Sequence, residues 1–310
     1  MARLLFVHAH PDDETLTCGI AMAHHVARGD EVHVLTATLG EEGEVIPPGL
    51  ADLEGDPDDR LGPYRHGELR RALGRIGAVW HVLGADGASG RLSRYRDSGM
   101  VGSAAAARPE AFAAADLDVA GGLVADLLRE LRPDVVVTYD EHGGYGHPDH
   151  VQTHRVTRRA LELLDDADRP GRVHEILTPV GWAREDRAWL AAADPALLDT
   201  AAWWSRQDLG PDAPPPPRLL VPAADDPFPP SVVPDDRVTH AVVDEAARAV
   251  QSDALREHAT QVIVASEEVH ALSNLVAART TSREGFRRVD PLTWETVGGP
   301  VEPGEAGLLG

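Results

Sequence analysis

Two short clusters of imidazole and carboxylate side chains are the residues of this sequence best suited to chemistry. The first reads His-Ala-His-Pro-Asp-Asp-Glu over residues 8–14 and follows the apolar run 4–7. The second reads Tyr-Gly-His-Pro-Asp-His over residues 145–150 and comes after the apolar run 135–137. Neighbouring parallel strands of an α/β sheet end at one crevice. The two clusters are therefore predicted to form a single site.

The residue types in this site suit a catalytic metal. His10, Asp13 and His150 can supply two imidazoles and one carboxylate, and three protein ligands leave a position for water in catalytic zinc sites. The same set also suits Fe²⁺ and Mn²⁺. Asp12 is adjacent to Asp13, and a carboxylate that lies beside a metal without binding it is a natural general base.

The second cluster adds polar groups that could act on the same reacting centre. His147 could stabilise a developing oxyanion or protonate a leaving amine, and Tyr145 offers a hydroxyl to a tetrahedral intermediate. Asp149 could accept a hydrogen bond from an imidazole and so fix its tautomer. The spacing of both clusters favours metal-dependent hydrolysis.

Strands and helices that would position these clusters alternate along the first part of the chain. Apolar patterns predict strands over 4–8, 31–38, 79–83, 134–139 and 175–180, and helices over 15–28, 67–76, 116–131 and 148–164. This alternation is typical of the α/β class. We expect a Rossmann-like, mostly parallel sheet with helices on both faces.

The C-terminal part of the chain is predicted to be different. Residues 1–182 are expected to form the metal-binding catalytic domain, and 183–310 a smaller α+β domain with a helix over 242–259 and a strand over 261–265. Residues 211–236 contain ten prolines. Proline lacks the N–H that helices and central strands need, so this segment is expected to be an extended surface loop.

Composition excludes several functional classes. The formal charge of −22 argues against nucleic acid and anionic membranes as partners. All 29 basic residues are arginine, which excludes P-loop and Schiff-base chemistry because both need lysine. The single Cys18 excludes an internal disulfide framework and fits the cytoplasm. We also expect neither a signal peptide nor a membrane span.

The residues 9–14 and 147–150 resemble the LmbE-like, or PIG-L, family of metal-dependent N-deacetylases. Within it, TLGEEGEVI at 38–46, RDSGM at 96–100 and Ala-Thr-Gln at 259–261 favour one subgroup. That subgroup hydrolyses the acetamide of N-acetylglucosaminyl-inositol to glucosaminyl-inositol and acetate in mycothiol biosynthesis. The alternatives are the mycothiol S-conjugate amidases, which share the fold and the metal cluster, and other LmbE-like sugar N-deacetylases.

The resemblance implies a role for each residue of the two clusters. It assigns one divalent metal per subunit, with zinc favoured and ferrous iron also suited, to His10, Asp13 and His150. Asp12 becomes the general base and a candidate for the acid that returns the proton. His147 and Tyr145 are implied to stabilise the oxyanion, and Asp149 to orient a histidine.

The resemblance further implies where a small amino-sugar inositol substrate binds. Four residues are implied to contact its hydroxyl groups: Glu44, Arg65, Asp97 and Met100. Nothing in the sequence determines the oligomeric state.

Two other classes of protein remain as alternatives. A nucleotide-binding oxidoreductase needs a glycine-rich turn after the first strand, where this chain has Pro-Asp-Asp at 11–13. A non-catalytic metal-binding protein would lose no turnover when Asp12 is replaced.

Overall fold

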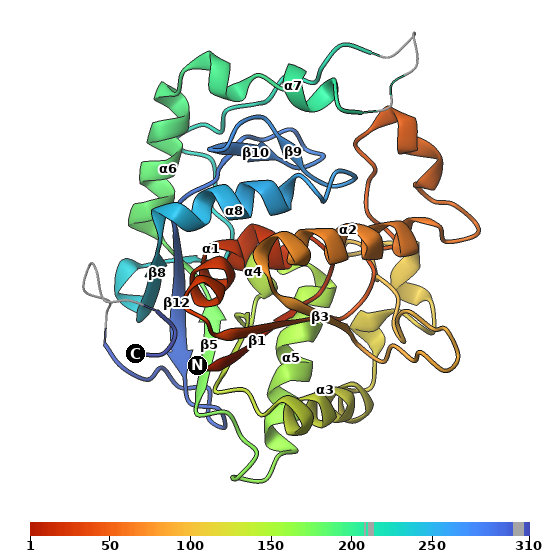
Figure 1. Cartoon of the computed structure of the whole chain (residues 1–310), viewed down its shortest axis with the longest axis vertical. Coiled ribbons are helices and arrows are strands. Elements are labelled where there is room, and N and C mark those ends of the chain that lie inside the picture. The colour runs from red at the N-terminus through yellow and green to blue at the C-terminus, as the bar shows by residue number, and fades with distance from the viewer. Residues whose placement is uncertain (208, 210–213, 300–306) are drawn as a thin grey trace.

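A seven-stranded sheet forms the centre of the protein. The structure is a computed structural model that describes residues 1–207, 209, 214–299 and 307–310. The strand order is β3-β2-β1-β4-β5-β12-β8 (Figure 1). Strands β3, β2, β1, β4 and β5 pair in parallel, whereas β12 runs antiparallel to both of its neighbours. The strands are β1 (Arg3–His8), β2 (Glu31–Thr36), β3 (Val79–Val82), β4 (Val135–Tyr139), β5 (Arg172–Ile176), β8 (His240–Val243) and β12 (Arg283–Val289).

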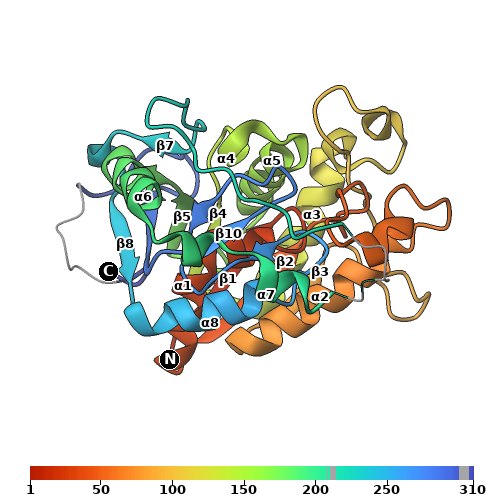
Figure 2. The same cartoon turned by 90° about the horizontal axis from the view of Figure 1, so that it is seen from above.

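Helices cover both faces of this sheet. One core holds β1 and β2 residues against α1 (Asp13–Ala27), α2 (Leu61–Ile76) and α8 (Glu245–Leu255). The other core packs α3 (Leu117–Leu131) and α5 (Pro148–Glu162) on the opposite face. Figures 1 and 2 show α8 lying across α1 and α2, which it contacts. The predicted fold class is confirmed.

The two central strands β1 and β4 bring the chemical clusters together. Phe6 of β1 pairs with Val34 on one side and with Val137 of β4 on the other. β4 is buried along its whole length, as is β1 after its first residue. Buried parallel strands read as continuous apolar runs, which is why the sequence predicts them well. Because β1 and β4 are parallel neighbours, the residues that follow them lie at the same edge of the sheet.

A smaller region beyond α5 has an apolar core of its own. A three-stranded sheet and the helices α6 and α7 enclose a separate apolar core that includes Trp203 and Ile263. The other elements are α4 (Gly143–Gly146), α6 (Val180–Ala192), α7 (Ala201–Trp204), β6 (Thr178–Pro179), β7 (Val232–Val233), β9 (Ile263–Val264), β10 (Val269–Ala271), β11 (Ala278–Arg279), η1 (Pro48–Leu53), η2 (Ala104–Ala107), η3 (Phe112–Ala114), η4 (Pro195–Leu198) and η5 (Asp235–Arg237).

Two predicted elements of the later part of the chain have wrong bounds, and one strand was missed. The helix predicted over 242–259 is strand β8 followed by α8, because Asp244 accepts hydrogen bonds from the N–H groups that open α8. The strand predicted over 175–180 ends at Ile176, and α6 begins at Val180. Strand β12 was not predicted, since its sequence Arg-Glu-Gly-Phe-Arg-Arg-Val has too few apolar residues for a recognisable pattern.

The domain boundary at residue 182 stays a prediction. Strands β8 and β12, from beyond that boundary, complete the same sheet that β1 and β4 begin. The proline-rich segment is described from residue 214, and residues 211–213 lie outside the described residues. It packs on α7 through hydrogen bonds from Thr200 Oγ1 and Trp204 Nε1 to proline carbonyls at 2.6 and 3.0 Å. No helix among the described residues combines the length and apolarity needed to cross a bilayer.

Candidate active site

A strained turn joins β1 to α1. Asp12, the residue before the helix, has φ 106° and ψ −36°. Such a conformation costs a non-glycine residue about 1–3 kcal/mol and persists only where the surroundings hold it. The carbonyl of Asp12 accepts the first helical hydrogen bond, from Leu16 N–H at 2.9 Å. The peptide unit that precedes Asp12 is held twice, because Glu14 Oε2 accepts from Asp12 N–H at 3.1 Å and Arg65 Nη2 donates to Pro11 O at 2.6 Å.

Asp13 joins the two clusters. Its Oδ2 accepts the backbone N–H of His10 at 2.9 Å and lies 3.3 Å from His10 Nδ1. The same oxygen lies 3.2 Å from His150 Nε2, which comes from the first turn of α5. Asp13, His10 and His150 are all buried. The three residues predicted as metal ligands therefore converge on one point.

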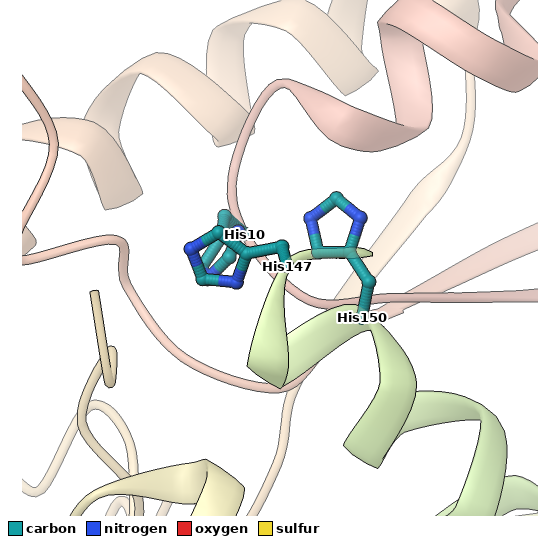
Figure 3. A group of neighbouring side chains, drawn as sticks. All are labelled: His10, His147 and His150. Carbon is teal, nitrogen blue, oxygen red and sulfur yellow. The ribbon is translucent and has the colours of Figure 1, made fainter. Parts of the chain in front are cut away.

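His147 lies beside these residues at the start of α5. Figure 3 shows its imidazole next to those of His10 and His150, and ring nitrogens of the three lie within 4.8 Å of one another. His147 Nδ1 accepts a hydrogen bond from Asp149 N–H at 3.2 Å. In its neutral form the ring therefore carries its proton on Nε2.

Carboxylates surround the far side of His10. Its Nε2 lies 3.2 Å from Asp149 Oδ2 and 3.5 Å from Asp97 Oδ1. Asp149 Oδ2 also accepts the N–H of Ser98 at 2.9 Å. Asp149 thus contacts His10, one of the histidines that it was predicted to orient. Ser98, which fixes Asp149, was not predicted, although it lies within the RDSGM stretch at 96–100.

Two tyrosines contact His150. Tyr139, at the end of β4, stacks on the ring with centroids 4.3 Å apart, and its hydroxyl accepts from Ala9 N–H at 3.1 Å. Tyr145 meets the same ring edge-on at 5.0 Å and is 55% exposed. Tyr139 was not predicted, because a tyrosine that ends a buried strand gives no signal that separates it from a core residue.

Burial and charge give the acids and imidazoles unlike proton affinities. Burial, together with the like charge of Asp13, raises the pKa of Asp12 to about 7 against the opposing effect of Arg65. Burial acts in the same direction on Asp13, but His150 and His10 outweigh it and hold its pKa well below the usual range. Burial lowers the pKa of His147 to about 4, reinforced by His10 and His150. Asp12 and Asp13 therefore differ in chemistry despite being neighbours.

The four residues predicted to bind substrate are placed differently. Asp97 is buried beside His10, and Arg65 is buried with Nη1 on Gly40 O at 2.6 Å and Nη2 3.3 Å from Asp12 Oδ1. Met100 is exposed in the loop that follows Asp97. Glu44 is exposed and lines a pocket of about 480 Å³ whose other walls come from residues 45–54, Trp204, the proline-rich segment and residues 273–275.

The donor set fits a divalent metal. His150 Nε2 is buried and, among the described residues, makes no hydrogen bond of normal geometry, although Asp13 Oδ2 is only 3.2 Å away. A buried polar atom left in this way calls for a partner. Two imidazoles within 3.3 Å of one carboxylate oxygen are ligand types that zinc and ferrous iron both accept.

Comparisons with known proteins show the family of this chain. A family model described as PIG-L, GlcNAc-PI de-N-acetylase, matches residues 5–161. A 1D-myo-inositol 2-acetamido-2-deoxy-alpha-D-glucopyranoside deacetylase of Geodermatophilus obscurus is 46% identical over 293 residues, which cover 93% of this chain and 92% of the relative. The chain belongs to the PIG-L family. The predicted family and enzyme class, an N-deacetylase that hydrolyses an amide, are confirmed.

Two further proteins are similar to this chain. The deacetylase of the same description from Thermobifida fusca is 44% identical over 286 residues, covering 92% of this chain and 91% of its own. Among solved structures, the N,N'-diacetylchitobiose deacetylase of Pyrococcus horikoshii is 15% identical with a TM-score of 0.48, covering 98% of this chain and 88% of its own.

Proposed function

We propose that this PIG-L protein hydrolyses the acetamide of N-acetylglucosaminyl-inositol, giving glucosaminyl-inositol and acetate in mycothiol biosynthesis. The observation that carries the proposal is the meeting of both clusters at Asp13, with Asp12 beside it as a carboxylate of different proton affinity. Relatives that match more than nine-tenths of the chain are described as deacetylases of this compound. Their descriptions support the same substrate here.

His10, Asp13 and His150 are the residues that we propose to hold the metal. When bound, a divalent metal would polarise the acetamide carbonyl and lower the pKa of water. Zinc is the favoured ion, with ferrous iron as the alternative, since the ligand types suit both.

Asp12 acts as the general base in this proposal. A pKa of about 7 lets its carboxylate take a proton from water at neutral pH and hold it afterwards. The same group can then return that proton to the departing amine nitrogen. Arg65, 3.3 Å from Asp12 Oδ1, would orient the carboxylate.

His147 and Tyr145 would stabilise the oxyanion. His147 is neutral at neutral pH because burial lowers its pKa, and its protonated Nε2 can donate a hydrogen bond. The hydroxyl of Tyr145 keeps its proton because partial burial of its ring against His150 and the nearby Asp13 raise its pKa. Both groups are donors throughout the neutral range, which is what a developing negative oxygen requires.

Substrate contacts are proposed for Asp97 and Arg65 at the cluster and for Met100 and Glu44 at its exposed surroundings. Carboxylate oxygens and guanidinium N–H groups are suitable partners for sugar and inositol hydroxyls. The proposed compartment is the cytoplasm, where a lone buried thiol such as Cys18 stays reduced.

Anaerobic purification, metal analysis and an acetate-release assay test the proposal. We expect about one metal per chain and acetate release from N-acetylglucosaminyl-inositol that is lost on chelation and restored by zinc or ferrous iron. A strong preference for a mycothiol S-conjugate would show that the substrate is wrong. Turnover that survives complete removal of the metal would show that the mechanism is wrong.

A further inference from the structure

A fully buried pair, Glu14 and His258, lies behind the turn that carries Asp12. Glu14 Oε1 is 3.1 Å from His258 Nε2, and neither side chain is exposed. We propose that His258, acting through Glu14, is a positioning residue that holds Asp12 in the conformation needed by a general base. The proposal rests on the function proposed above, in which Asp12 is that base.

The carboxylate of Glu14 links the two parts directly. Its Oε2 accepts the backbone N–H of Asp12 at 3.1 Å. Its Oε1 accepts the hydroxyl of Thr15 at 2.6 Å and faces His258 Nε2. Thr15 Oγ1 also lies 3.2 Å from His258 Nε2. One oxygen of Glu14 therefore holds the Asp12 peptide, while the other is fixed by His258 and Thr15.

The conformation of Asp12 needs such support. At φ 106° the residue lies where side chains are rarely tolerated, and its peptide would relax if the contacts around it were lost. Arg65 holds the preceding carbonyl and Leu16 N–H holds the carbonyl of Asp12 itself. The N–H of Asp12 is held by Glu14. A rotation of this peptide would redirect the Asp12 carboxylate.

Glu14 in turn needs His258. A carboxylate with no exposed surface is costly unless a donor or cation satisfies it, and the imidazole supplies that partner. His258 is fixed by the turn that follows α8, whose Thr260 donates its N–H and hydroxyl to the two oxygens of Glu68 at 2.9 and 2.6 Å. Glu68 belongs to α2, the helix that also carries Arg65. The backbone of the base is thus held from α2 and from the C-terminal region together.

The test compares His258→Gln with His258→Asn. Both side chains are neutral amides, but only glutamine places an N–H donor where His258 Nε2 lies. We expect the asparagine variant to lose about 10-fold or more in kcat, the usual scale for a supporting partner, with KM and metal content near wild type. The glutamine variant should recover most of that kcat. A crystal structure of the asparagine variant should show Asp12 away from φ 106°.

His270→Asn is the matched control. His270 lies on β10 and, like His258, contacts a threonine, with Nδ1 2.8 Å from Thr280 Oγ1. We expect its kcat to stay near wild type. The proposal would be overturned if kcat fell equally in His258→Asn and His270→Asn, or equally in His258→Asn and His258→Gln. A rise in KM at constant kcat in His258→Asn would also overturn it. If the wild-type protein hydrolyses neither N-acetylglucosaminyl-inositol nor a mycothiol S-conjugate, the proposed function fails. An unchanged backbone conformation of Asp12 in His258→Asn would overturn the present inference independently of that result.

Discussion

The two strand ends that meet in this site are built in opposite ways. After β1, Asp12, Asp13 and Glu14 are all buried, and side chains from α2 and from the turn after α8 hold them. After β4, the corresponding turn contains three glycines with positive φ and an exposed Tyr145. Its hydrogen bonds include Gly144 N–H to Asp140 Oδ1 and Ser231 N–H to Gly144 O.

This difference suggests a division of labour. In the proposed mechanism, the β1 end carries the general base and two of the three metal ligands, whose placement must be exact, so a rigid and strained backbone is useful there. The β4 end carries the third proposed ligand, His150, and the proposed donors to an oxygen whose position would change during the reaction, and glycine leaves that backbone adaptable. Variants of the proposed base at the β1 end should therefore cost more activity than variants of the proposed oxyanion donors at the β4 end.

Replacing the proposed base should have the largest effect. We expect Asp12→Ala to lower kcat by about 100-fold or more, the range for loss of a general base, because His10, Asp13 and His150 remain to hold the metal. Kinetics and metal content should be measured together. The exposed Asp58→Ala serves as control and should behave as wild type. Near-full activity in the Asp12 variant would refute its assignment and remove the basis of the comparison.

Removing the tyrosine hydroxyl at the β4 end should cost less. We expect Tyr145→Phe to lower kcat by about 10-fold, below the usual range for an oxyanion donor, because the side chain is 55% exposed and competes with water. Steady-state kinetics would measure the loss, with Tyr64→Phe on the surface of α2 as the control. A loss of kcat as large as that of the Asp12 variant would mean that substitutions at the two strand ends cost equal activity.

The same contrast explains what the sequence could predict. His10, Asp13 and His150 are identifiable because ligand chemistry resides in residue type and because β1 and β4 are continuous apolar runs. The Glu14–His258 pair joins residues 244 positions apart, so its existence depends on how α8 packs.

Strand β12 escaped prediction for a related reason. Its central Phe286 is fully buried, but charged residues precede and follow it. Only pairing with β5 and β8 makes this segment a strand.

A buried carboxyl group packs against the helix that continues the β1 end, and its burial predicts a pH effect on stability. Glu284 of β12 accepts the N–H groups of Ile20 and Ala21 in α1, and burial raises its pKa from 4.5 to about 8. The folded state therefore keeps a proton that the unfolded state has lost. This contribution to stability is fully present below pH 4.5 and disappears as pH rises through 8.

Urea unfolding of wild type and Glu284→Gln at pH 5.5 and pH 8 would measure this effect. From pH 5.5 to pH 8, the free energy of unfolding of wild type should fall by about 1–2 kcal/mol more than that of the variant. This figure follows from about 1.4 kcal/mol per unit of pKa shift, reduced for partial solvent access. Parallel pH dependence in the two proteins would show that Glu284 titrates normally and that its burial against α1 does not oppose ionisation.

The smallest expected effect tests the strain itself through a reciprocal pair. Asp12→Gly and Asp12→Ala both lack the carboxylate, but glycine tolerates φ 106° and alanine does not. We therefore expect the glycine variant to be more stable by about 1 kcal/mol in urea unfolding. At the β4 end, Gly144→Ala introduces the same kind of strain at φ 71°, and the added methyl meets open space. Its free energy of unfolding should fall by a similar amount. Equal stability of the two Asp12 variants, alongside a loss at Gly144, would mean that the β1 turn relaxes once its side chain is removed and that the carboxylate itself maintains the strain.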